Sequence, residues 1–143
     1  MMIIISTTHL HEMQAHGQRA YPEECCGALM GVIDPQDQRK ITHQVLPLEN
    51  ESEENRHRRF KITAQDYMRL ERQAKQEGVS LLGFYHTHPD HPAQPSETDL
   101  KAAWPVFSYL ILSVQKGEPS TLNSFVLDTK THCFIEEALH VND

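Results

Sequence analysis

The histidines at positions 86 and 88 are the residues best placed to bind a metal ion. Residues two apart on a β-strand point to the same face, with Cα atoms about 6.6 Å apart, so two imidazoles can converge on one ion. Asp99 follows a proline-rich loop, where we expect a helix to begin. Two nitrogens and one carboxylate oxygen suit zinc and leave a tetrahedral position for water, as in catalytic zinc sites.

Each part of this pattern also has a simpler interpretation. A His-x-His pair can occupy the solvent face of a strand. Ser96 and Asp99, three residues apart, form a capping-box pattern in which Ser96 is the N-cap of the helix. The combination of features favours the metal site: an apolar strand ends in two histidines, and a proline-rich loop and an acidic first helical turn follow it. The start of this helix can be capped and bind the metal at the same time.

Other catalytic signatures fit the sequence poorly. His11-Glu12 begins like the His-Glu-x-x-His zinc motif, but Ala15 stands where the second histidine is needed. No glutamate neighbours the histidine pair and no Pro-Cys-x-x-Cys follows it, which excludes the zinc deaminase pattern. A nucleophilic Cys25 or Cys26 rests only on a chance match with one of ten histidines, and buried inert thiols are more common.

Composition limits the class of protein. The 143 residues predict one domain spanning 1–143. The net charge of −7 counts against nucleic acid as a partner. No stretch approaches the roughly 18 apolar residues of a membrane span, so we expect no membrane partner. Three cysteines, an odd number with two adjacent, argue against a disulfide framework and favour a cytoplasmic setting.

The hydrophobic pattern predicts a mixed α/β fold with one largely antiparallel sheet and two or three helices. The histidine pair comes at the end of the most continuously apolar segment, which we expect to be a central strand buried on both faces. Helices are expected from residues 6–8 to before Pro22, from 63 to 78 and over 96–104. Strands are expected at 2–5, 24–33, 39–48, 79–85, 107–114, 122–127 and 132–139, with the end of a further strand at 60–62.

The pattern of residues 86–99 resembles the signature of the JAMM (MPN-plus) zinc metalloproteases. It consists of His86-Thr-His88, seven residues, Ser96, two residues and Asp99. The segment 22–27, Pro-Glu-Glu-Cys-Cys-Gly, resembles the Glu-x-x-Gly element of that family and selects Glu24, not Glu23, as the matching carboxylate. Gly83 and the strands around the site extend the resemblance over most of the chain. It implies the JAMM/MPN fold, with a cytidine-deaminase-like architecture.

The resemblance also implies a mechanism. His86, His88 and Asp99 would hold one Zn²⁺, and Glu24 would take a proton from the zinc-bound water and pass it to the leaving amine. Ser96 would hydrogen-bond the developing oxyanion or orient the water. The bond cleaved would be a peptide or isopeptide bond after the tail of a ubiquitin-like or sulfur-carrier protein, whose Gly-Gly terminus is thereby released.

Two other functions remain open at this stage. A non-catalytic zinc module could bind ubiquitin-like proteins, although all five signature positions are filled. A nucleic-acid role is possible because JAMM-like domains occur in DNA-related proteins, although the net charge opposes it. His91 and the 56–59 cluster, Arg-His-Arg-Arg, have no assigned role, and we expect Trp104 in the core and His16 on a polar helix face.

Overall fold

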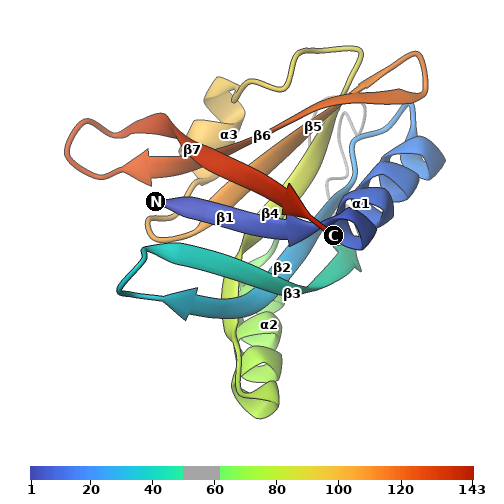
Figure 1. Cartoon of the computed structure of the whole chain (residues 1–143). Helices are drawn as coiled ribbons and strands as arrows, with labels where there is room; N and C mark the ends of the chain where they lie inside the picture. Colours follow the sequence, from blue (N-terminus) through green and yellow to red (C-terminus); the bar gives the residue numbers. More distant parts are fainter. Residues whose placement is uncertain (50–61) are drawn as a thin grey trace.

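The structure is a computed structural model that describes residues 1–49 and 62–143. Within this part of the chain, seven strands and three helices follow one another in the order predicted (Figure 1). The strands are β1 (Met2–Ser6), β2 (Cys26–Asp34), β3 (Arg39–Leu48), β4 (Ser80–Pro89), β5 (Ser108–Gln115), β6 (Glu118–Asp128) and β7 (Cys133–Asn142), and the helices are α1 (Thr7–Ala20), α2 (Ala64–Glu77) and α3 (Glu97–Ala102).

The sheet is mixed and largely antiparallel, as predicted, and its strands close in the order β1-β3-β2-β4-β5-β6-β7. The parallel pairs are β1 with β3, β1 with β7, and β4 with β5. The first and last strands therefore lie side by side (Figure 1). At the centre, β4 pairs with β2 on one side and β5 on the other, which fixes both backbone edges of the strand that carries the histidines.

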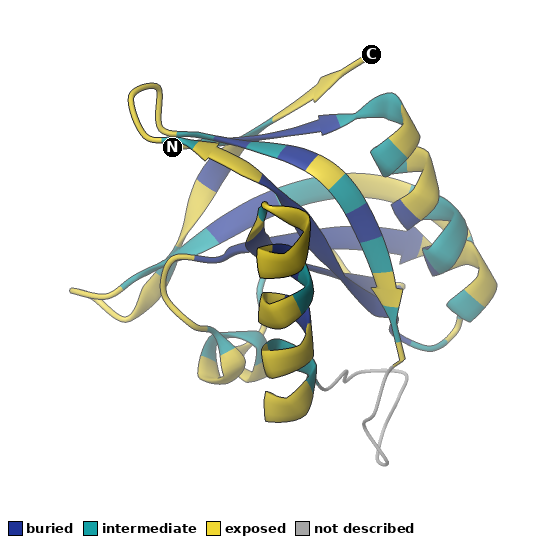
Figure 2. Cartoon of the chain, turned by 90° about the horizontal axis from the view of Figure 1, so that it is seen from below, coloured by how far each residue is buried: buried dark blue, intermediate teal, exposed yellow. Residues whose placement is uncertain are grey.

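Two apolar clusters cover the two faces of the sheet. Met13 on α1 packs with Leu29, Leu82 and Tyr85 on one face. On the other face α2 packs over the sheet, and its outward surface is mostly exposed (Figure 2). Because side chains alternate along β4, Phe84, His86 and His88 share the face covered by α2. The burial of these apolar side chains stabilises the scaffold of the site.

The boundaries of several elements differ from the prediction. β4 continues through Pro89, so both histidines lie on the strand. β2 begins at Cys26, which leaves Glu24 in the segment that joins α1 to this strand. Trp104 is 53% exposed, so its predicted core position is wrong. Phe60 and the 56–59 cluster lie outside the described residues, and Ile62 is not in a strand.

Three further features concern helices and cysteines. Each helix begins with a capping box, in which Ser6, Thr63 and Ser96 are the N-caps. The helices of the described part fall short of the length and apolarity that a membrane span requires. No disulfide joins any of the three cysteines, all of which lie among the described residues.

Candidate metal centre and active site

His86 and His88 project from the central strand into the same buried space. Their exposed fractions are 1% and 8%, and their Nε2 atoms lie 3.1 Å apart. β2 and β5 flank the backbone at His86, so the separation of the two rings is set by strand geometry. The predicted convergence of the two imidazoles is therefore present in the structure.

Asp99 reaches both histidines from the first turn of α3. Its Oδ1 lies 3.2 Å from Nε2 of His86, and its Oδ2 lies 3.2 Å from Nε2 of His88. Asp99 also completes the capping box: its Oδ2 accepts the Ser96 N–H at 2.8 Å, and its own N–H donates to Ser96 Oγ at 3.1 Å. The helix terminus therefore serves capping and the site together.

The three donor groups fit a zinc ion. Zinc bonds of about 2.1 Å in a tetrahedral arrangement place neighbouring ligand atoms about 3.4 Å apart. The donor atoms of His86, His88 and Asp99 are separated by 3.1–3.2 Å where they face one another. Two imidazoles and one carboxylate are also the borderline-soft donors that zinc prefers. The residues predicted as ligands therefore match such a site in both chemistry and spacing.

The loop after β4 fixes the orientation of His88. Nδ1–H of His88 donates to the Pro92 carbonyl at 2.9 Å, which leaves the Nε2 lone pair directed toward His86 and Asp99. Asp90 holds the loop, because its N–H donates to the Val114 carbonyl at 2.7 Å and its Oδ2 accepts the Tyr21 hydroxyl at 2.6 Å. Neither Pro92 nor Asp90 was predicted to support the site.

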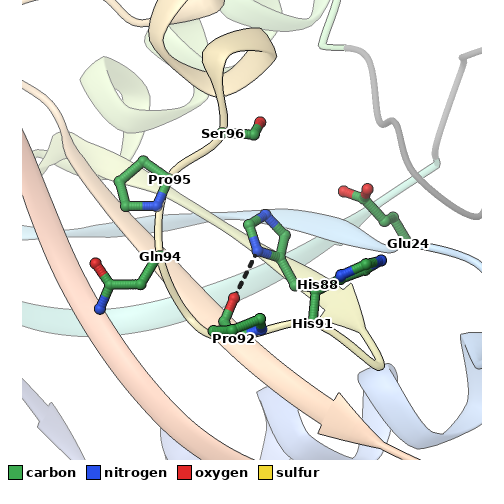
Figure 3. Close-up of a pocket in the computed structure, with 7 residues that line it drawn as sticks. All are labelled: Glu24, His88, His91, Pro92, Gln94, Pro95 and Ser96. Carbon is green, nitrogen blue, oxygen red and sulfur yellow. Dashed lines mark hydrogen bonds between the residues drawn. The ribbon is translucent and has the colours of Figure 1, made fainter.

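Glu24 lies beside this cluster, on the segment between α1 and β2. It is 5% exposed, and donor atoms of Glu24, His86 and His88 all lie within 4.8 Å of one another. Figure 3 shows the Glu24 carboxylate on one side of the His88 ring and Ser96 on another. Glu24, His88, His91 and Ser96 line a cavity of about 430 Å³. The structure thus brings together all five residues of the predicted constellation.

Burial and mutual contact shift the pKa values of these groups. Burial raises the pKa of Glu24 to about 8, whereas the charge of His88 acts in the opposite direction. Burial also acts to raise the pKa of Asp99, but hydrogen bonds with His86 and His88 outweigh it and hold that pKa well below its ordinary value. Burial lowers the pKa of His86, which favours the neutral, ligating form of this imidazole.

The glycine of the Glu-x-x-Gly element has a packing role. A Cβ at Gly27 would lie 2.1 Å from Cε2 of Tyr85, so only glycine leaves room for the ring. Tyr85 is fully buried and immediately precedes His86. His16, which we expected on a polar helix face, instead contacts the Tyr85 hydroxyl at 2.7 Å.

Three proteins with known or probable activities are similar to this chain. The chain is 33% identical over 93 residues to a desampylase of Haloferax volcanii (64% of this chain and 63% of the relative). It is 35% identical over 99 residues to a probable TtuB-protein conjugate cleaving protease of Thermus thermophilus (66% and 58%). A CysO-cysteine peptidase of Mycobacterium bovis is 25% identical over 125 residues (87% and 82%). The matches span less than two thirds of the length of the Haloferax and Thermus relatives.

Solved structures show the same fold. A protein from Desulfitobacterium hafniense superposes with a TM-score of 0.84 at 28% identity, covering 100% of this chain and 94% of that one. A JAB1/MPN domain protein from Archaeoglobus fulgidus superposes with a TM-score of 0.56 at 17% identity, covering 98% and 99%. The family described as prokaryotic homologues of the JAB domain matches residues 6–128, which include the whole site. The chain therefore belongs to this family of prokaryotic JAB-domain (JAMM) proteins.

Proposed function

We propose that this chain is a zinc-dependent metallopeptidase that cleaves the peptide or isopeptide bond after the tail of a ubiquitin-like or sulfur-carrier protein. The observation that carries the proposal is the convergence of His86, His88 and Asp99 within 3.2 Å, with Glu24 buried beside them. The names of the relatives supply the substrate class, because they refer to desampylation, TtuB–protein conjugates and CysO-cysteine.

Each residue has a distinct role in the proposed reaction. Zinc held by His86, His88 and Asp99 would supply Lewis acidity and lower the pKa of bound water. Glu24, buried beside these ligands, would accept a proton and return it to the leaving amine. Ser96 Oγ already accepts the Asp99 N–H, which leaves the hydroxyl proton available to donate to a developing oxyanion.

An apolar groove offers a surface for the body of the ubiquitin-like protein. It has a volume of about 700 Å³ between α2 and the segment after α3, and its exposed side chains include Met68, Trp104 and Val106, at 62%, 53% and 79%. Tyr67 and Trp104 also line a second cavity that reaches His86 and Asp99. Exposed apolar surface that continues toward a reaction centre is typical of a substrate-docking site.

Cleavage is tested by the intact mass of a ubiquitin-like protein with a C-terminal extension, incubated with zinc-loaded chain with and without a chelator. We expect a product ending at the Gly-Gly terminus that disappears with the chelator. Glu24→Gln should lower the rate at least about a hundredfold, since general acid–base catalysis contributes this much or more. The matched control is Glu23→Gln, which removes the neighbouring carboxylate and should leave the rate within about twofold. Unchanged cleavage by Glu24→Gln refutes the mechanism.

Docking is tested with Trp104→Ala and the same fusion. We expect KM to rise about tenfold with little change in kcat, because truncation of a central aromatic contact weakens binding without touching the reacting groups. Ile135→Ala removes a side chain of similar exposure, 51%, on β7 and serves as the control. Equal KM values for the two variants would exclude this groove as the docking surface.

A further inference from the structure

The segment between α3 and β5 contains a turn with an unusual backbone at Val106. Pro105 and Val106 lie in this turn, and the φ angle of Val106 is +73°. Proline followed by a residue of positive φ is typical of a type II turn, in which glycine usually occupies the second of these positions. A β-branched residue with positive φ is rare and strained. Among the described non-glycine residues with positive φ, Val106 alone is β-branched; the others are Gln38, Asp90, Lys116 and His132.

The side chain of Val106 does not compensate for this strain by packing in the core, because it is 79% exposed. Glycine at this position would form the same turn without the strain. What valine adds to the turn is an isopropyl group held at the surface. This group lines the apolar groove between α2 and the segment after α3.

A buried lysine holds the turn from inside the sheet. Lys40 on β3 is 2% exposed, and its Nζ donates to the carbonyl of Val106 at 3.1 Å and to Ser108 Oγ at 2.6 Å. Ser108 Oγ in turn donates to Glu137 Oε1 at 2.7 Å, and Lys40 Nζ lies 3.8 Å from Glu137 Oε2. Ser124 Oγ donates to the same Oε1 at 2.8 Å. The carbonyl of Val106 is therefore held by a network anchored on β3, β5, β6 and β7.

Stability alone does not account for this network. Burial takes both charges of an ion pair out of water, so apolar residues of similar volume are often at least as stabilising. The hydrogen bond from Lys40 to the carbonyl of Val106 is a contact that an apolar residue cannot make. It distinguishes Lys40 from an apolar replacement, and it acts on the strained residue.

The turn borders both the groove and the cavity that reaches two of the predicted metal ligands. Trp104, Val106 and Phe107 line the groove, and Trp104 also lines that cavity. The N–H of Trp104 donates to the hydroxyl of Tyr109 at 2.7 Å, and its ring stacks on Tyr67 with centroids 4.8 Å apart. A partner that covers the groove with its body and extends its tail toward the metal ligands therefore passes over this turn.

We propose that Val106 is a specificity-determining contact for the body of the ubiquitin-like partner, and that Lys40 is a positioning residue that holds Val106 in place. This inference rests on the proposed function. The surface of the partner that fits here is apolar, because Met68, Trp104 and Val106 are the exposed apolar side chains of the groove. The charged residues described in its lining are one acidic and one basic, so they offset each other.

Val106→Gly separates this role from a purely structural one. Relief of the strain should outweigh the greater freedom of glycine in the unfolded chain, so Tm should rise by about 2–6 °C. For the fusion that tests cleavage, KM should rise about tenfold with little change in kcat, because an apolar contact with the partner is lost. A residue that served the fold alone would show the rise in Tm without the rise in KM.

Val106→Thr keeps the branched shape and the strained backbone but replaces one methyl group with a hydroxyl. It should leave Tm within about 2 °C and raise KM about threefold. Val141→Thr is the matched control, since Val141 is 37% exposed on β7, outside the lining of the groove, and should leave KM unchanged. Titration calorimetry of the uncleaved fusion with Glu24→Gln chain repeats the comparison without catalysis: Val106→Gly should raise Kd about tenfold, and Val141→Thr should not.

Lys40→Met/Glu137→Leu tests the positioning role, because it replaces the ion pair with apolar residues and leaves the carbonyl of Val106 without the ammonium. KM should rise about three- to tenfold, and this effect should not add to that of Val106→Gly, since Lys40 acts through Val106. Ser108→Ala removes only the hydroxyl that links Lys40 to Glu137 and should act in the same direction with a smaller effect. This variant decides the point if the double variant does not fold.

Two results overturn the inference while Glu24-dependent cleavage leaves the proposed function standing: a wild-type KM in Val106→Gly, or additive effects of the Lys40 and Val106 variants. If wild type sediments as a dimer that Val106→Gly dissociates with unchanged KM, a second copy of the chain covers the groove, and the inference is wrong. If wild type cleaves no fusion, the proposed function fails, and this inference fails with it.

Discussion

Gly27→Ala tests whether the packing behind the site is as tight as the structure shows. The new Cβ would lie 2.1 Å from Cε2 and 2.5 Å from the hydroxyl of Tyr85, well inside van der Waals contact. The φ angle of Gly27 is not in the left-handed region, so alanine meets no backbone penalty and the clash alone carries the effect. Tyr85 is fully buried between β2 and β5 and cannot move freely.

Overpacking of this kind costs about 1–3 kcal/mol. For a chain of this length, about 3–4 °C of Tm corresponds to each kcal/mol, so we expect Tm to fall by about 3–12 °C. Displacement of Tyr85 should also move the adjacent His86 and weaken zinc binding. Both effects have one cause, so they should appear together.

Thermal unfolding and zinc titration of the apo chain measure the two effects. In a Tyr85→Leu background the same alanine meets space instead of a ring, so its additional cost should fall below about 0.5 kcal/mol. A Gly27→Ala variant with wild-type Tm and wild-type zinc affinity would refute the close approach of Tyr85. An equal cost in both backgrounds would show that another contact is responsible.

Three further predictions concern capping and buried charge. Ser96→Ala should lower the free energy of unfolding by about 1 kcal/mol in denaturant titration and should also lower kcat. Ser96→Asn should retain the helix cap but not the hydroxyl. If both variants keep the wild-type kcat, Ser96 has no role beyond capping. Lys40→Met leaves the buried Glu137 without its cation and should lower the free energy of unfolding by about 3–5 kcal/mol. The double variant Lys40→Met/Glu137→Leu should recover much of this loss. If the effects of the two substitutions simply add, the pairing is contradicted. Burial acts to raise the pKa of Asp66, but hydrogen bonds outweigh it and hold this pKa low. The Asp66 carboxylate therefore stabilises α2 at pH values above its unfolded pKa, and this stabilisation is lost as the pH falls below about 4. The Tm of Asp66→Asn should decline less than that of wild type between pH 5 and pH 3, and identical declines would exclude the effect.

The order of strands and helices could be predicted because apolar periodicity and turn residues are local signals. The closure of the sheet could not, because β1 pairs with β7 through residues more than 130 positions apart, such as Met2 and Ala138. The predicted strand 79–85 ended too early, because His86 and His88 are polar residue types that do not continue an apolar run. They are buried in β4 because they face one another and Asp99.

The candidate site was largely predictable because its chemistry requires particular residue types at fixed spacing. Glu24 came only from the resemblance of its Glu-x-x-Gly element, as nothing in its local sequence separates it from Glu23. The supporting contacts were not predictable: which carbonyl orients His88 depends on how the proline-rich loop folds. Trp104 was misplaced because an apolar residue after a helix looks the same in sequence whether it faces the core or solvent.

The most direct test of the metal centre is anomalous diffraction at the zinc edge from crystals of the zinc-loaded chain. The geometry predicts one strong peak about 2.1 Å from Nε2 of His86, from Nε2 of His88 and from one carboxylate oxygen of Asp99, at one zinc per chain. A peak more than about 3 Å from any of these three atoms, or zinc bound only at other histidines, would contradict the shared site.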